Sequence, residues 1–171
     1  MNPFIRSLID LTSFRLIGQN AATSSDTTIK SVTNCNETTI TFSDPETTAV
    51  NNTTICDLVA IQFDLGDTDI GDIDTLPELI AFFTRIIQRI LPKMNTDRFC
   101  CKEETSCRCN QSKASFFANS VGPVNIVLNT SAICSHLEDL TVITVNNNVV
   151  WFIDDSGTVT IACLTDIVAF G

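Results

Sequence analysis

Charged side chains are scarce in this sequence, and their scarcity limits the partners that the protein can have. Only 18% of the 171 residues are Asp, Glu, Lys or Arg, whereas about 25% is usual for a soluble domain. Positive charge is the scarcer sign, because 10 Lys and Arg stand against 20 Asp and Glu and leave a net charge of −10. Nucleic acid and anionic membranes repel such a chain. We therefore expect neither as a partner.

Lys and Arg are absent from residues 34–84 and again from residues 114–171. Seven of the 10 basic residues lie between these stretches, in residues 85–113, beside three acidic ones. Blocks of opposite sign attract each other within one subunit or between neighbouring subunits. A surface with so little charge also tends to meet another surface. The composition therefore favours a protein that assembles.

Long apolar runs and catalytic signatures are missing as well. No stretch reaches the ~18 apolar residues of a membrane-spanning helix, and Arg6 and Asp10 interrupt the place where a secretory signal would need its apolar segment. P-loop, dinucleotide-binding and nucleophile-elbow patterns do not occur. The one histidine, His136, has only sequence neighbours as potential partners. We expect no enzyme, no cofactor and no classical signal peptide.

Short segments rich in Thr, Val and Ile, separated by turn residues, dominate the chain from residue 27 onward. They are typical of strands. Their spacing predicts a mainly β fold, an antiparallel β-sandwich or jelly-roll-like domain over residues 27–171. The strands expected in its second half are residues 114–118, 123–129, 140–145, 149–154, 158–164 and 166–170.

One amphipathic helix is expected within this domain, over residues 75–91. Thr75 and Glu78 have the spacing of a capping box, and Pro92 ends the helix. Apolar residues recur every three or four positions and form one stripe. They are Leu79, Ile80, Phe83, Ile86, Ile87, Ile90 and Leu91.

Residues 1–26 are distinct from this domain, since an apolar segment is followed by a polar linker. Asn2 and Pro3 suit a helix start and Gly18 its end, although residues 13–17 could equally be extended. The segment is expected to be an N-terminal arm that docks on a neighbour, or a helix folded on its own core. The residues expected to make the assembly contact are Pro3, Phe4, Ile5, Leu8, Ile9, Leu11, Phe14, Leu16 and Ile17.

The chain holds eight cysteines, which could form disulfides, bind zinc or stay free. Adjacent Cys100 and Cys101 bridge each other only with strain, so each is expected to have another partner. The spacings C-C and C-x-C also depart from the usual pairs of a zinc site. We predict disulfides, at least one of them between subunits. The cysteines are Cys35, Cys56, Cys100, Cys101, Cys107, Cys109, Cys134 and Cys163.

An acidic segment precedes the expected helix and allows a calcium site as an alternative. Counted from Asp67, Asp69 and Glu78 fall at positions 3 and 12 of a calcium-binding loop, and Asp72 lies between them. Gly71 falls at position 5, where the loop needs its glycine at position 6. The simpler interpretation is a solvated loop whose carboxylates favour the helix N-terminus.

The cysteine pattern resembles that of the cysteine-rich surface proteins of Bacillus-type spores, namely endospore appendage fibre subunits and exosporium proteins. The resemblance lies in Cys100-Cys101, in Cys107-Arg108-Cys109 and in the strand TVTIACLTDI around Cys163. Paired cysteines of the appendage subunits lie in an N-terminal connector, whereas here they are in mid-chain, so the N-terminal segment would dock without a covalent bond. The resemblance implies a jelly-roll fold, stacking by strand augmentation and disulfide locking.

These observations predict a self-assembling structural subunit of a disulfide-stabilised surface fibre, such as a spore appendage or pilus, or of an exosporium layer. Copies would form a homo-oligomeric, head-to-tail filament, with residues 2–17 packing on the next subunit or adding a strand to it. Other spore-surface proteins are further candidate partners, and the expected location is extracellular. Two alternatives stay open: a calcium- or receptor-binding adhesin module, and a viral or phage coat subunit.

Overall fold

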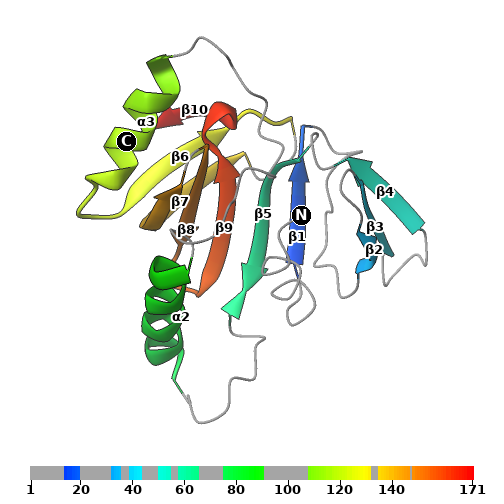
Figure 1. The fold of residues 1–171 in the computed structure, drawn as a ribbon, viewed down its shortest axis with the longest axis horizontal. Helices are drawn as coiled ribbons and strands as arrows, with labels where there is room; N and C mark the ends of the chain where they lie inside the picture. Colours follow the sequence, from blue (N-terminus) through cyan, green and yellow to red (C-terminus); the bar gives the residue numbers. More distant parts are fainter. Residues whose placement is uncertain are drawn as a thin grey trace.

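A computed structural model of the chain describes residues 14–19, 32–35, 39–43, 50–54, 58–65, 75–90, 108–131, 135–146 and 148–171. This part is mainly β, and seven antiparallel strands form one sheet that curls into a half-barrel (Figure 1). The strands, in their order across the sheet, are β1 (Phe14–Gly18), β5 (Leu58–Asp64), β9 (Thr158–Cys163), β8 (Val149–Ile153), β7 (His136–Asn146), β6 (Val124–Leu128) and β10 (Ile167–Phe170). The helices are α2 (Leu76–Ile90) and α3 (Arg108–Ala118), with a 3₁₀ turn, η5 (Leu164–Asp166), before β10.

A second, three-stranded antiparallel sheet contains β2 (Val32–Cys35), β3 (Thr39–Ser43) and β4 (Val50–Thr54), in that order. Together the two sheets confirm the prediction of a mainly β, antiparallel chain. The larger sheet by itself is a single curled layer. The sandwich or jelly roll that the strand spacing predicts is a more specific arrangement, which this layer alone does not establish.

Helix α2 packs on one face of the seven-stranded sheet, which we call the α2 face. The ring of Phe83 lies 5.8 Å from that of Phe63 in β5. The side-chain amide of Gln88 donates a 3.2 Å hydrogen bond to the carbonyl of Ile143 in β7. The helix predicted over residues 75–91 is thus confirmed, with its boundaries within one residue of those observed. Its buried side chains are Leu79, Phe83 and Ile87.

Helix α3 covers the opposite face, the α3 face. Phe117 is fully buried there, with its ring 5.3 Å from that of Phe152 in β8. Phe152 pairs directly with Thr160, and Thr160 pairs with Gln62, the residue before Phe63. Paired residues share a face of a sheet and successive residues alternate between faces. Phe152 and Phe63 therefore point to opposite faces, and the two helices cover opposite sides.

Coverage from both sides explains the apolar runs of the central strands. All five residues of β8, VVWFI, are buried, as are the last five of β9. A strand that is solvated on one face alternates apolar and polar residues, whereas a strand buried on both faces reads as a continuous apolar run. The sheet is therefore the middle layer of this part of the protein.

The structure corrects one predicted strand, residues 114–118, which are the last turns of α3. The segment ASFFA looks like a strand because it is short and rich in aromatic residues. In the helix, Phe117 and Ala114 are one turn apart and both contact the core of the α3 face. Packing against an existing sheet thus outweighs a weak local preference for an extended backbone.

The structure also corrects the role expected for the end of the N-terminal arm. Residues 14–18 form β1, which pairs with β5 of the same chain. Leu16 and Ile17 are at most 1% exposed, and Ile17 belongs to the core of the α3 face. These two side chains are therefore core residues of their own subunit and are unavailable to a neighbour. Phe14 lies in the same strand, opposite Phe63.

The hairpin between β8 and β9 is closed by a polar turn. One carboxylate oxygen of Asp154 accepts hydrogen bonds from the backbone N–H groups of Ser156 and Thr158, at 2.9 and 2.8 Å. Gly157 follows with a φ of 86°, in a region that favours glycine.

Among the described helices, none has the length and apolar character of a membrane-spanning segment.

Candidate assembly surface

The last strand of the sheet, β10, presents an exposed edge. It pairs with β6 on one side, and within the described residues no strand pairs with its other side. Ile167 at its start is buried, whereas Val168 is 59% exposed and Phe170 is 38% exposed. An open strand edge with apolar side chains is a template for pairing with another strand. β10 is therefore the first candidate for a contact between subunits.

The hydrogen bonds between β10 and β6 show which backbone groups of β10 remain available. Gly171 and Asn125 exchange both backbone hydrogen bonds, at 2.7 and 3.1 Å. The backbone groups of neighbouring residues in an antiparallel strand point in opposite directions. The N–H and C=O of Phe170 therefore point away from β6, toward the free edge.

An aromatic cluster lies beside this edge. The ring of Phe170 is 4.8 Å from that of Phe116 and 5.5 Å from that of Phe117, both in α3. Phe117 is buried, but Phe116 is 37% exposed. Rings at these separations and tilts gain stability beyond the area they bury. We call the exposed residues Phe116, Val168 and Phe170 the edge patch.

Helix α3 is fixed firmly beside the patch. The ammonium group of Lys113 donates a 2.9 Å hydrogen bond to the carbonyl of Leu164, in the turn before β10. At the C-terminal end, the side-chain amide of Asn119 donates to the carbonyl of Ser115 at 2.7 Å, and the Ser120 hydroxyl donates to that of Phe116 at 2.9 Å. These two side-chain bonds add to the backbone bond that the same carbonyls share from the Asn119 N–H. The edge patch is therefore held on two ordered elements.

The opposite edge of the sheet, β1, is partly occupied by its own chain. The backbone N–H of Ser131 donates a 3.1 Å hydrogen bond to the carbonyl of Gln19, and the Thr130 hydroxyl donates to the carbonyl of Gly18. Thr130 and Ser131 follow β6, at the other side of the sheet. These bonds draw the two sides of the curled sheet together and leave β10 as the more open edge.

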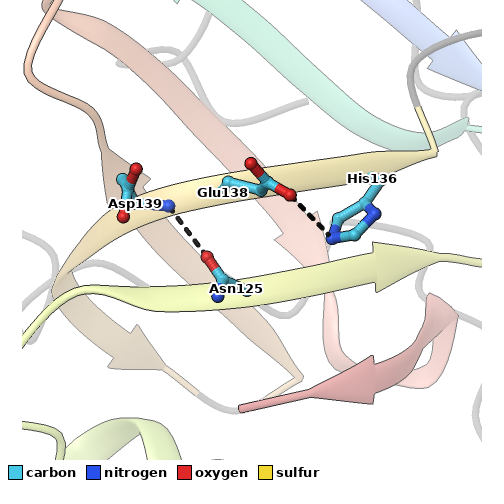
Figure 2. A network of polar contacts seen from close by, with 4 residues as sticks. All are labelled: Asn125, His136, Glu138 and Asp139. Atoms are coloured by element: carbon cyan, nitrogen blue, oxygen red, sulfur yellow. Dashed lines mark hydrogen bonds and ion pairs between the residues drawn. The ribbon is translucent and has the colours of Figure 1, made fainter.

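A polar cluster occupies the end of the α2 face over β6 and β7, shown in Figure 2. The side-chain oxygen of Asn125 accepts a 3.0 Å hydrogen bond from the backbone N–H of Asp139. His136 and Glu138 lie 3.5 Å apart and are both largely exposed. Asp139 has a φ of 54°, which Asp and Asn tolerate better than most residues. The two carboxylates of the cluster face solvent.

One of the eight cysteines expected to form disulfides has a described side chain. Cys163, at the end of β9, is 1% exposed and is disulfide-bonded. Cys35 ends β2 and Cys109 lies in α3, and the structure describes their backbones alone. The partner of Cys163 is thus one of the cysteines whose side chains lie outside the described part. The cysteines wholly outside it are Cys56, Cys100, Cys101, Cys107 and Cys134.

Most of the expected calcium ligands lie outside the residues that the structure describes. Asp67, Asp69 and Asp72 lie outside the described residues, whereas Glu78 is an exposed side chain in the first turn of α2. Within the part of the chain that the structure describes, no group of three His, Cys, Asp or Glu side chains could hold a metal ion.

The first residues expected to make the assembly contact, from Pro3 to Leu11, also lie outside the described residues.

Sequence reasoning missed the edge patch. It placed residues 166–170 in a strand but gave that strand no role, and it placed Phe116 in a strand rather than in a helix. One signal was available: neighbouring residues in a helix lie about 100° apart around the axis, so two adjacent aromatic residues do not point in the same direction. Once Phe117 is inside, Phe116 is directed toward the surface.

No protein-family model matches the chain, and neither a curated protein nor a solved structure matches it.

Proposed function

We propose that this protein is a self-assembling structural subunit whose copies join through the free edge of β10. The observation that carries the proposal is the edge patch together with the outward backbone groups of Phe170. Strand addition supplies backbone hydrogen bonds, and the apolar side chains on either side supply burial. The scarcity of surface charge supports assembly as well.

The partner of β10 in this proposal is β10 of a second copy, paired antiparallel across a two-fold axis. Two antiparallel copies of one strand are self-complementary, which is what a two-fold contact requires. The edge of β1 is the other candidate. It is disfavoured because its last carbonyls already accept hydrogen bonds from Thr130 and Ser131. The head-to-tail contact expected from the sequence therefore gives way to a symmetric one.

Pairing of β10 alone is expected to be weak. The strand is four residues long, and each added hydrogen bond contributes only about 0.5–1.5 kcal/mol. Burial of the edge patch adds to this, and cystines would resist dissociation by restricting the separated and unfolded chains. The disulfide at Cys163 supports a location in an oxidising environment, where disulfides persist.

That place, we propose, is an extracellular surface such as a spore exosporium or appendage, as the cysteine pattern implies. The jelly-roll-like arrangement belongs to the same proposal. It requires the sheet of β2, β3 and β4 to cover part of the seven-stranded sheet, so that two layers enclose a core. Electron microscopy of purified protein with and without reductant tests the assembly directly, and dispersed monomers in both samples would refute it.

A matched pair of variants tests the role of β10. Val168→Lys places a charge on the free edge, a substitution that blocks strand pairing in many sheets. Val121→Lys makes the same change at a fully exposed residue in the loop after α3. Sedimentation velocity should show smaller species for Val168→Lys and a wild-type distribution for Val121→Lys. Equal distributions for the two variants would contradict the proposal.

Hydrogen exchange tests the pairing itself. The amide of Phe170 points toward the free edge, so it should exchange quickly in dispersed protein and slowly in the assembled form. The amide of Gly171 is bonded to Asn125 in both forms and serves as the internal control. Fast exchange of the Phe170 amide in assembled protein would exclude strand addition at this edge.

A further inference from the structure

Helix α2 carries an exposed stripe of unusual character for an acidic protein. Phe82, Arg85 and Arg89 lie at i, i+3 and i+7, so they share the side of the helix that faces away from the sheet. All three are exposed. Neither arginine forms an ion pair with any residue that the structure describes. The stripe therefore joins an exposed ring to two positive charges that have no ion-pair partner among the described residues, on a chain of net charge −10.

The complementary surface is the polar cluster of Figure 2. Glu138 and Asp139 are exposed carboxylates, and the ion-pair partner of Glu138 is a histidine rather than a permanent cation. Val127 lies beside them in β6, opposite His136, and is half-buried. This surface thus offers two negative charges and an apolar neighbour, which matches the composition of the α2 stripe in reverse sign.

Both surfaces lie on the same side of the sheet. Val124, Ile126 and Leu128 belong to the core of the α3 face, so the alternating residues of β6 point to the α2 face. His136 pairs with Val127 and therefore points there too. Helix α2 packs on the same face farther along β7, where Gln88 bonds the carbonyl of Ile143. One face of the sheet thus carries both surfaces, the basic stripe on α2 and the acidic cluster at the start of β7.

We propose that two copies pack with their α2 faces together, so that the basic stripe of each meets the acidic cluster of the other. A two-fold axis places residue i of one copy against residue j of the second and repeats the contact in reverse. Two surfaces of opposite charge on one face are what this symmetry needs. The occupant is a second copy of this chain, because charge complementarity is built into a single subunit.

This inference rests on the proposed pairing of β10 and explains how it could yield a fibre. A two-fold contact through β10 alone closes as a dimer. A second two-fold contact through a different surface links dimers to one another, and alternation of the two contacts gives an open chain when the two axes do not intersect. The α2 face would therefore supply the contact that turns a closed pair into an open chain.

The test is carried out in the Val168→Lys protein, where the α2-face contact should leave dimers. Arg85→Glu with Arg89→Glu reverses the stripe, and Glu138→Lys with Asp139→Asn reverses the cluster. Asn is chosen at position 139 because it tolerates the positive φ. Each double variant alone should dissociate at least about tenfold more readily, measured by sedimentation equilibrium, since like charges then oppose each other or attraction is lost.

An equimolar mixture of the two double variants gives the decisive measurement. One contact then joins a reversed stripe to a reversed cluster, and the other joins a native stripe to a native cluster. Affinity should return to within about twofold of the parent, and it should fall as salt is raised. A mixture that stays monomeric overturns the proposal. The proposal is also overturned if reversing the stripe abolishes the dimers while reversing the cluster does not. That result would indicate that the stripe binds another anionic partner.

The two proposals fail separately. If Val168→Lys leaves wild-type assembly unchanged, the role of β10 is wrong, while the mixture still measures the α2-face contact. If the stripe and cluster variants assemble as the wild type does, the α2-face contact is wrong, and the exchange of the Phe170 amide still measures the β10 contact. Circular dichroism of each variant confirms that the fold is retained.

Discussion

Phe116 and Phe117 are neighbours in α3, but they have different surroundings. Phe117 is 1% exposed and contacts Phe152 on the sheet, whereas Phe116 is 37% exposed and contacts Phe170 beside the free edge. Burial makes the first a residue of the core, and exposure leaves the second available for a contact with another molecule. Substitutions at the two positions would therefore separate the stability of the subunit from the proposed assembly.

Phe117→Ala should lower the free energy of unfolding by about 3–5 kcal/mol, because it removes a buried ring and leaves a cavity. Phe116→Ala should cost less than about 1 kcal/mol, yet it should weaken assembly because it removes part of the edge patch. Denaturant unfolding of dispersed protein measures the first effect and sedimentation measures the second. Equal losses of folding stability in the two variants would contradict the assignment of Phe117 to the core.

At the scale of elements, the turn between β8 and β9 connects the sheet to α2. Gly157 lies in this turn with a φ of 86°, and a Cβ added there would lie 2.8 Å from Cδ1 of Leu76, the first residue of α2. Gly157 also bonds Leu65, since its carbonyl accepts a 3.0 Å hydrogen bond from the Leu65 N–H. Gly157 therefore permits both the tight turn of the hairpin and the close approach of α2.

Gly157→Ala is expected to destabilise the protein by about 1–2 kcal/mol, because an L-residue resists this backbone conformation. The contact with Leu76 adds less, since the end of that side chain can rotate away. Gly122→Ala is the control: nothing lies within 4 Å of its added Cβ, so it should be neutral or slightly stabilising. Thermal unfolding compares them, and an unchanged midpoint for Gly157→Ala would show that the strain is relieved elsewhere.

At the scale of the whole molecule, the disulfide at Cys163 ties the end of a central strand to another part of the chain. Such a bond stabilises mainly by restricting the unfolded chain, typically by about 2–4 kcal/mol. Full reduction should therefore lower the unfolding midpoint of dispersed protein in denaturant. Cys163→Ala without reductant should reproduce part of that loss. Identical midpoints for oxidised, reduced and variant protein would refute a stabilising role.

Reduction also separates the sources of assembly. The proposed strand pairing at β10 and charge pairing at the α2 face would not require thiols, so reduced protein that remains folded should still associate, although less persistently. Dissociation by reductant without unfolding would instead indicate that disulfides between subunits are the main contact. Sedimentation beside circular dichroism distinguishes these outcomes.

Much of the fold follows from local sequence pattern. The helix over residues 75–91 is predictable because one apolar stripe recurs at helical spacing over four turns, which no strand pattern imitates. The strands from Val149 to Phe170 are predictable because turn residues separate β-branched runs. The sequence identifies Cys163 as one of eight candidate cysteines. It does not identify the disulfide partner, because that depends on which cysteines lie close together in space.

The sequence by itself therefore determined the antiparallel β character, helix α2 and the shortage of surface charge, since each depends on residues close together in the chain or on composition. Tertiary structure alone decided that residues 114–118 are helical, that Leu16 and Ile17 join their own sheet, and that β10 is the open edge. The physical reason is that burial and edge pairing depend on which distant strands become neighbours. The placement of the basic stripe and the acidic cluster on one face was decided in the same way, because 49 positions separate Arg89 from Glu138 along the chain.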